Sequence, residues 1–188
     1  RNKANMLKKF SWVFVETVST VVFQFLSIVI LARMLTPRDY GVLGMMIIFI
    51  ALGNMIVDSG MGSAIVKKEK VTETDYSTLF IYNLVISGII YAVLFGIAGF
   101  IADFYKTPEL ISFIKVLSFT IMISALGVIQ NARLVRALKF RQLAIVAFVS
   151  NLGSLALAII LAGLGYGVWA LIYQQLCLMT LRVALLFA

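Results

Sequence analysis

The sequence of 188 residues contains no histidine and a single cysteine, Cys177. A lone cysteine excludes an internal disulfide, and the lack of histidine removes the commonest metal ligand and the usual acid–base catalyst at neutral pH. The sequence also carries no glycine-rich phosphate loop with its lysine and no nucleophile elbow built on serine. We therefore expect no metal, no cofactor and no enzymatic activity.

Charge is scarce as well, because only 13% of the residues are charged, against about 25% in a soluble domain. Hydrophobic residues instead make up 62% of the chain, and the mean hydropathy is +1.06. A composition this apolar is typical of an integral membrane protein. Because the sequence opens at Arg1 rather than at a methionine, we also expect it to be a piece of a longer chain.

Long apolar runs divide the sequence. A helix needs about 20 apolar residues to cross a hydrocarbon layer roughly 30 Å thick. The runs are continuous rather than alternating, which favours helices over the strands of a membrane barrel. Pro37, Pro108 and the glycines at 163, 165 and 167 fall near their ends. We predict an all-α membrane fold with six transmembrane helices at about 11–35, 41–64, 79–102, 110–131, 143–164 and 168–188.

The net charge of +8 does not indicate nucleic acid, because the basic residues gather between the apolar runs. Threading the six runs through a membrane places eleven lysines and arginines on one side and four on the other. The richer side is the cytoplasmic one in membrane proteins. We therefore predict a multi-pass membrane protein with a cytoplasmic N-terminus. Its cytoplasmic basic residues are Arg1, Lys3, Lys8, Lys9, Lys67, Lys68, Lys70, Arg133, Arg136, Lys139 and Arg141.

Polar side chains within the runs are informative because lipid does not solvate them. Four of them in the first run, from Glu16 to Ser27, fall within an arc of roughly 80° at 100° per residue. Hydrogen bonding between helices explains many single polar residues, whereas Gln24 with Glu16 two turns below it is equally compatible with a water-filled cavity. The candidates for lining a cavity or substrate path are Glu16, Gln24, Arg33, Asn54, Asp58, Asn83 and Gln174.

Two of these candidates have competing structural interpretations. Arg33 can bind an anionic substrate group, but its long stem can also reach the membrane surface, or its guanidinium can pair with Asp39. Asp58 heads an Asp-Ser-Gly turn, so it can simply end a helix. The sixth run adds Gln175 and the charged Arg182.

Two segments carry a resemblance to a known family. The segment LARMLTPRDYG at 31–41 is similar to the end of the first helix in polysaccharide-exporting flippases, and DSGMGSAIV at 58–66 resembles the end of their second helix. Weaker echoes follow in order at 103–110 and in GYGVWAL at 165–171. The chain resembles the Wzx-type oligosaccharide flippases, closest to the colanic-acid branch of the multidrug/oligosaccharidyl-lipid/polysaccharide exporter superfamily.

The resemblance implies two six-helix lobes that form a V, with alternating access to a central cavity; this chain would be the N-terminal lobe and its partner the C-terminal lobe of the same protein. The implied substrate is an oligosaccharide linked to undecaprenyl pyrophosphate, moved to the periplasmic leaflet for polysaccharide assembly. Membrane lipids and a coupling cation, H⁺ or Na⁺, are further expected partners. Flippases for the related lipid II place several arginines in the first two helices, whereas only Arg33 lies there in this sequence.

Two other functions are compatible with the same features. A multidrug extruder of the same superfamily would share the architecture, although the segments at 31–41 and 58–66 point away from it. A structural subunit of a polysaccharide export complex would use its polar faces only to hold helices together. Protection of cavity residues by substrate distinguishes transport from the structural role.

Overall fold

The computed structural model describes the backbone of residues 2–58 and 71–188 and the side chains of residues 11–57 and 71–188. The described residues form six helices and no strand. Each helix is long and apolar enough to cross a membrane, which confirms the predicted all-α fold with six spans. The helices are α1 (Asn2–Ala32), α2 (Pro37–Asp58), α4 (Glu73–Phe104), α5 (Leu110–Arg136), α6 (Phe140–Gly163) and α7 (Val168–Phe187).

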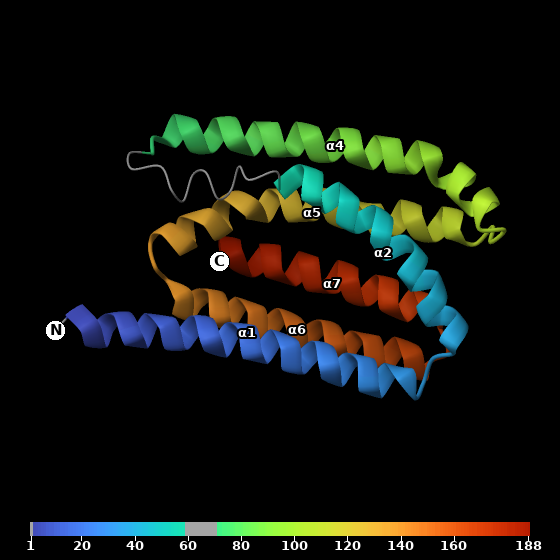
Figure 1. Cartoon of the computed structure of the whole chain (residues 1–188), viewed down its shortest axis with the longest axis horizontal. Helices are drawn as coiled ribbons and strands as arrows, with labels where there is room; N and C mark the ends of the chain where they lie inside the picture. The colour runs from blue at the N-terminus through green and yellow to red at the C-terminus, as the bar shows by residue number, and fades with distance from the viewer. Residues whose placement is uncertain (1, 59–70) are drawn as a thin grey trace.

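Helix α7 lies in the middle of the bundle (Figure 1). It packs on α6 at one side and on α5 at the other. Helix α1 packs chiefly on α6, whereas α2 packs on α4, α5 and α7. The bundle therefore consists of two groups of helices, α1 with α6 and α2 with α4 and α5, and α7 joins them.

Each group has its own apolar core, and α7 contributes to both. The larger core joins α2, α4 and α5, and Val168 and Ile172 of α7 complete it. The smaller core joins Leu31 of α1 to the alanines of α6. Ala170 and Leu171 of α7 complete that smaller core. One helix thus presents different faces to two cores.

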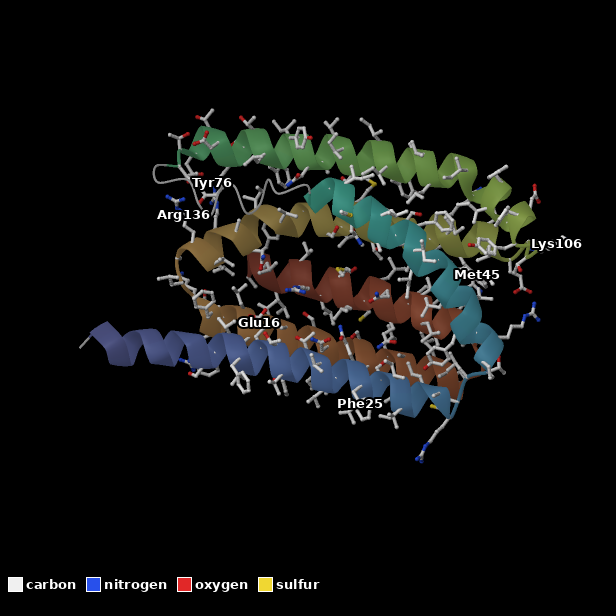
Figure 2. The ribbon with its side chains drawn as sticks, viewed as in Figure 1. Glu16, Phe25, Met45, Tyr76, Lys106 and Arg136 are labelled. Carbon is white, nitrogen blue, oxygen red and sulfur yellow. The ribbon has the colours of Figure 1, made fainter. Side chains whose placement is uncertain are left out.

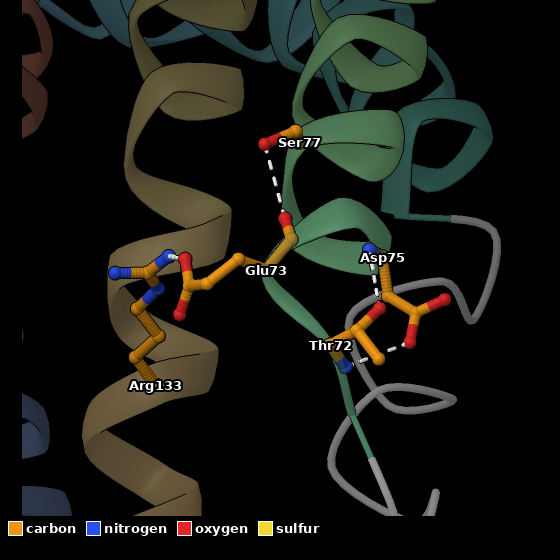
Figure 3. A network of polar contacts seen from close by, with 5 residues as sticks. All are labelled: Thr72, Glu73, Asp75, Ser77 and Arg133. Atoms are coloured by element: carbon orange, nitrogen blue, oxygen red, sulfur yellow. Dashed lines mark hydrogen bonds and ion pairs between the residues drawn. The ribbon is translucent and has the colours of Figure 1, made fainter.

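Helices α1, α2, α4 and α6 begin earlier than hydropathy predicts, and caps explain the difference for α2 and α4. Helix α2 begins at Pro37 rather than at 41, and α4 begins at Glu73 rather than at 79. In α4 the Thr72 side chain accepts a hydrogen bond from the Asp75 amide, while the Asp75 carboxylate accepts one from the Thr72 amide (Figure 3). This reciprocal cap satisfies amides that would otherwise lack partners at the helix start.

The same Thr-x-x-Asp arrangement starts α2. The Asp39 carboxylate accepts hydrogen bonds from the Thr36 amide and hydroxyl, both at 2.8 Å. Pro37 is well suited to the first helical position, since its missing N–H would have no partner there. Helix α1 correspondingly ends at Ala32, three residues before the predicted end at 35. The short turn between α1 and α2 therefore contains Arg33.

Candidate functional site

Polar side chains from α1, α6 and α7 meet in a cavity of about 270 Å³. Helix α2 closes one side of this cavity with Tyr40, Leu43 and Ile47. Its remaining apolar lining comes from Phe23, Ile28, Leu155, Leu171 and Leu178. Its polar lining consists of Gln24, Ser27, Asn151, Ser154, Gln174 and Gln175. We call this space the amide cavity, because carboxamides provide most of its hydrogen-bonding groups.

A hydrogen bond between two side chains joins two helices across the amide cavity. The Gln174 amide nitrogen donates to the Ser27 hydroxyl over 2.7 Å, which ties α7 to α1. The Asn151 amide donates to the Ala147 carbonyl within α6, so its side-chain oxygen is still able to accept. Carboxamides and hydroxyls both donate and accept hydrogen bonds, and sugar hydroxyls need partners of that kind.

A second cavity of about 150 Å³ continues from the first toward α5. Ile47 and Gln175 line both cavities, so the two are adjacent. Asn54 and Thr120 supply further polar groups to the second one. We call the two cavities together the groove; it follows α7 between its two groups of neighbouring helices.

A charged pair lies beside the groove. Glu16 Oε1 of α1 is 4.0 Å from a guanidinium nitrogen of Arg182 on α7. Glu16 faces the other helices, whereas Phe25, half a helical turn round, points away from the bundle (Figure 2). Phe25 is 64% exposed and Glu16 is 22% exposed, so the polar face predicted for α1 is its inward face.

The predicted site residues thus occupy different places. Gln24 and Gln174 lie in the amide cavity, and Asn54 lies in the second cavity. Glu16 reaches Arg182 instead of lining either cavity. Asn83 lies on α4, only 1% exposed, and lines neither cavity; its side-chain oxygen has no hydrogen-bond partner among the described residues.

Arg33 lies outside the groove. It is exposed in the turn between α1 and α2, and it is absent from the lining of both cavities. Its suggested partner Asp39 is instead engaged by Thr36 at the start of α2. Asp58 is the last residue of α2. The side chain of Asp58 and the rest of the segment at 58–66 lie outside the described residues, as do Lys67, Lys68 and Lys70.

Two features of the groove escaped the sequence analysis. The pairing of Glu16 with Arg182 joins residues 166 positions apart, and no local pattern links them. Tyr40 was not among the predicted candidates, but it lines the amide cavity and its hydroxyl donates to the Ile28 carbonyl over 3.4 Å. Leu43 follows Tyr40 by three residues and Ile47 follows Leu43 by four, so the three share one face of α2, and this spacing is the signal that was available.

Comparison with known proteins gives consistent results. A family model described as "Polysaccharide biosynthesis protein" matches residues 30–188. The succinoglycan biosynthesis transport protein ExoT of Rhizobium meliloti is 26% identical over 187 residues, which cover 100% of this chain and 38% of ExoT. The teichuronic acid biosynthesis protein TuaB of Bacillus subtilis is 24% identical over 79% of this chain and 31% of TuaB.

A third relative is the lipopolysaccharide biosynthesis protein WzxC of Escherichia coli, 22% identical over 72% of this chain and 27% of WzxC. The chain therefore spans less than two fifths of the length of these relatives. No solved structure matches it significantly.

Proposed function

The chain belongs to the polysaccharide biosynthesis protein family, and we propose that it is one lobe of a flippase that moves a lipid-linked oligosaccharide across the bacterial inner membrane. The observation that carries the proposal is the amide cavity, a space at membrane depth into which six polar side chains of otherwise apolar helices project. ExoT, named as a transport protein for succinoglycan biosynthesis, supports it. The substrate we propose is an oligosaccharide linked to undecaprenyl pyrophosphate.

The size of the amide cavity supports a two-lobed transporter. At about 270 Å³ it is at the lower limit of small-molecule pockets, which span about 300–1,000 Å³. The amide cavity alone therefore encloses too little space for an oligosaccharide. We propose that residues 1–188 are the N-terminal lobe, that a C-terminal lobe completes the cavity, and that alternating access exposes it to each side in turn.

The orientation and the energy source belong to the same proposal. The uneven distribution of lysines and arginines supports a cytoplasmic N-terminus. In this proposal the oligosaccharide enters from the cytoplasmic leaflet and leaves at the periplasmic one. The lipid tail stays in the bilayer while the sugar passes along the groove. For a coupling cation, H⁺ or Na⁺, we propose a site in the second lobe.

Substrate protection of single cysteines tests the proposal. The full-length protein is made cysteine-free, with Cys177 of this lobe replaced by alanine, and a cysteine is introduced by Gln24→Cys. A small hydrophilic maleimide is expected to label it in membranes, and lipid-linked oligosaccharide is expected to slow the labelling. Phe25→Cys is the matched control, because position 25 faces away from the bundle and neither labelling nor protection is expected.

Other outcomes identify the alternatives. Labelling at position 24 that a cationic drug slows and the oligosaccharide does not would make the protein a multidrug extruder. Labelling that neither compound slows would leave the polar side chains as interhelical contacts of a structural subunit.

A further inference from the structure

Glu16 and Arg182 lie within the membrane-spanning part of the bundle. Glu16 is five residues inside the apolar span Ser11–Ala32, about 7.5 Å along a helix with a rise of 1.5 Å per residue. A charge at this depth costs free energy unless it is paired or wetted, so ionisable residues there mark functional sites.

The charged pair continues the faces that build the groove. Arg182 follows Gln175 of the groove by seven residues, which is two turns along the same face of α7. Glu16 precedes Ser27 by eleven residues, which is three turns along one face of α1, or about 16 Å. Arg182 therefore lies about 10 Å along α7 from Gln175, within reach of a group that follows the sugar in an extended substrate.

The pairing with Glu16 leaves Arg182 able to bind something else. The two charges are 4.0 Å apart, too far for a hydrogen bond, and 43% of the Arg182 side chain is exposed. A guanidinium carries five N–H donors in a planar fork that fits two oxygens of one phosphate. The cavity beyond it is lined by uncharged side chains only. A sugar fits that cavity, whereas an anionic group fits Arg182.

We propose that Arg182, and not Arg33, binds the phosphate group that joins the saccharide to its lipid, and that the Glu16 carboxylate holds the guanidinium when no phosphate is present. The inference rests on the proposed function. Arg33 is exposed in the turn after α1 and lines neither cavity. When phosphate binds, Arg182 exchanges its loose contact with Glu16 for two hydrogen bonds, and the saccharide lies toward Gln174.

The experiment compares two conservative substitutions in the full-length protein, reconstituted in liposomes with lipid-linked oligosaccharide. Arg182→Lys keeps the charge but loses the planar fork, so we expect the half-saturating substrate concentration to rise about tenfold or more. Arg33→Lys is the matched control and is expected to transport like the wild type. Both variants are compared at equal amounts of protein in the membrane.

Removing the Glu16 carboxylate is expected to change the half-saturating concentration in the opposite direction. Glu16→Gln frees Arg182, so we expect a lower half-saturating concentration. The double variant Glu16→Gln/Arg182→Gln lacks both charges and is expected to lose transport while it still accumulates. Wild-type transport by Arg182→Lys, or by the double variant, would overturn the proposal and leave the two residues as a structural ion pair.

Binding measurements show whether Arg182 binds the phosphate of the substrate's lipid carrier or the phosphate of a membrane lipid. Undecaprenyl diphosphate and phosphatidylglycerol are each titrated into the purified protein. We expect Arg182→Lys to weaken the binding of undecaprenyl diphosphate and not that of phosphatidylglycerol; the reverse would mean that Arg182 binds membrane lipid, which also overturns the proposal. If wild-type protein binds both lipids but moves no oligosaccharide, the proposed function fails. The assignment of Arg182 as a phosphate-binding residue is not contradicted by that result.

Discussion

Replacement of Gln174 by leucine separates a role in transport from a role in helix packing. The substitution removes one hydrogen bond between α7 and α1, the 2.7 Å contact with Ser27. Such bonds contribute about 0.6 kcal/mol on average and about 1.7 kcal/mol at most within membranes. Leucine fills a similar volume without a polar atom, so the loss is small against a total stability of about 5–15 kcal/mol. We expect Gln174→Leu to insert and accumulate normally.

The effect on transport is expected to be larger than the effect on stability. Removing a hydrogen bond between an amide and a sugar hydroxyl lowers the binding free energy by about 0.5–1.5 kcal/mol. At substrate concentrations below saturation, this loss lowers the transport rate about two- to tenfold. The assay is oligosaccharide flipping in liposomes, normalised to protein amount, with the melting temperature measured on the same sample.

Gln130→Leu is the matched control for Gln174→Leu, because Gln130 lines a separate cavity between α4 and α5 and has no place in the groove. Wild-type flipping by Gln174→Leu would refute the reasoning and make the amide a contact between helices.

Three further predictions concern topology and stability. In a cysteine-free background, an impermeant maleimide applied from the periplasm should label Lys106→Cys and not Lys139→Cys; the reverse would invert the topology. Gly167→Ala should destabilise the protein by about 1–3 kcal/mol, because Gly167 has a φ of +53°; Gly99→Ala, within α4 and with open space at its Cβ, should not lower the melting temperature. Asn83→Leu should raise the melting temperature and preserve transport, because it removes a buried oxygen that has no partner in the described part of the chain; a loss of both would assign Asn83 a polar contact.

The existence of the six helices could be predicted from the sequence because each apolar run is long enough to span a membrane. The starts of α5 and α7 were predicted correctly at 110 and 168, whereas those of α2 and α4 could not be predicted from hydropathy because these two helices begin with polar residues. Thr36 and Thr72 each precede an aspartate by three residues and cap α2 and α4. This Thr-x-x-Asp pattern is visible in the sequence, and it places both starts where the structure has them.

From the sequence, the residues of the candidate site could be predicted only for each helix separately. The polar arc on α1 identified Gln24 and Glu16 as neighbours on one face, and both face the bundle. A helical wheel does not say which helix lies opposite, so the partners Ser27–Gln174 and Glu16–Arg182 needed the packed structure. Asn83 shows the limit, because a polar residue at membrane depth can also be buried in a contact between helices.

The position of the groove follows from the double role of α7. Val168 and Ile172 face the larger core, and Ala170 and Leu171 face the smaller one. At 100° per residue, Gln175 falls in the sector between these two faces. The smaller core is confined to one end of α1, α6 and α7, and further along the same helices its place is taken by Ser27, Asn151 and Gln174. Polar residues therefore replace apolar ones where α7 passes between its two groups of neighbours, and a path for a hydrophilic group through this lobe has to follow α7.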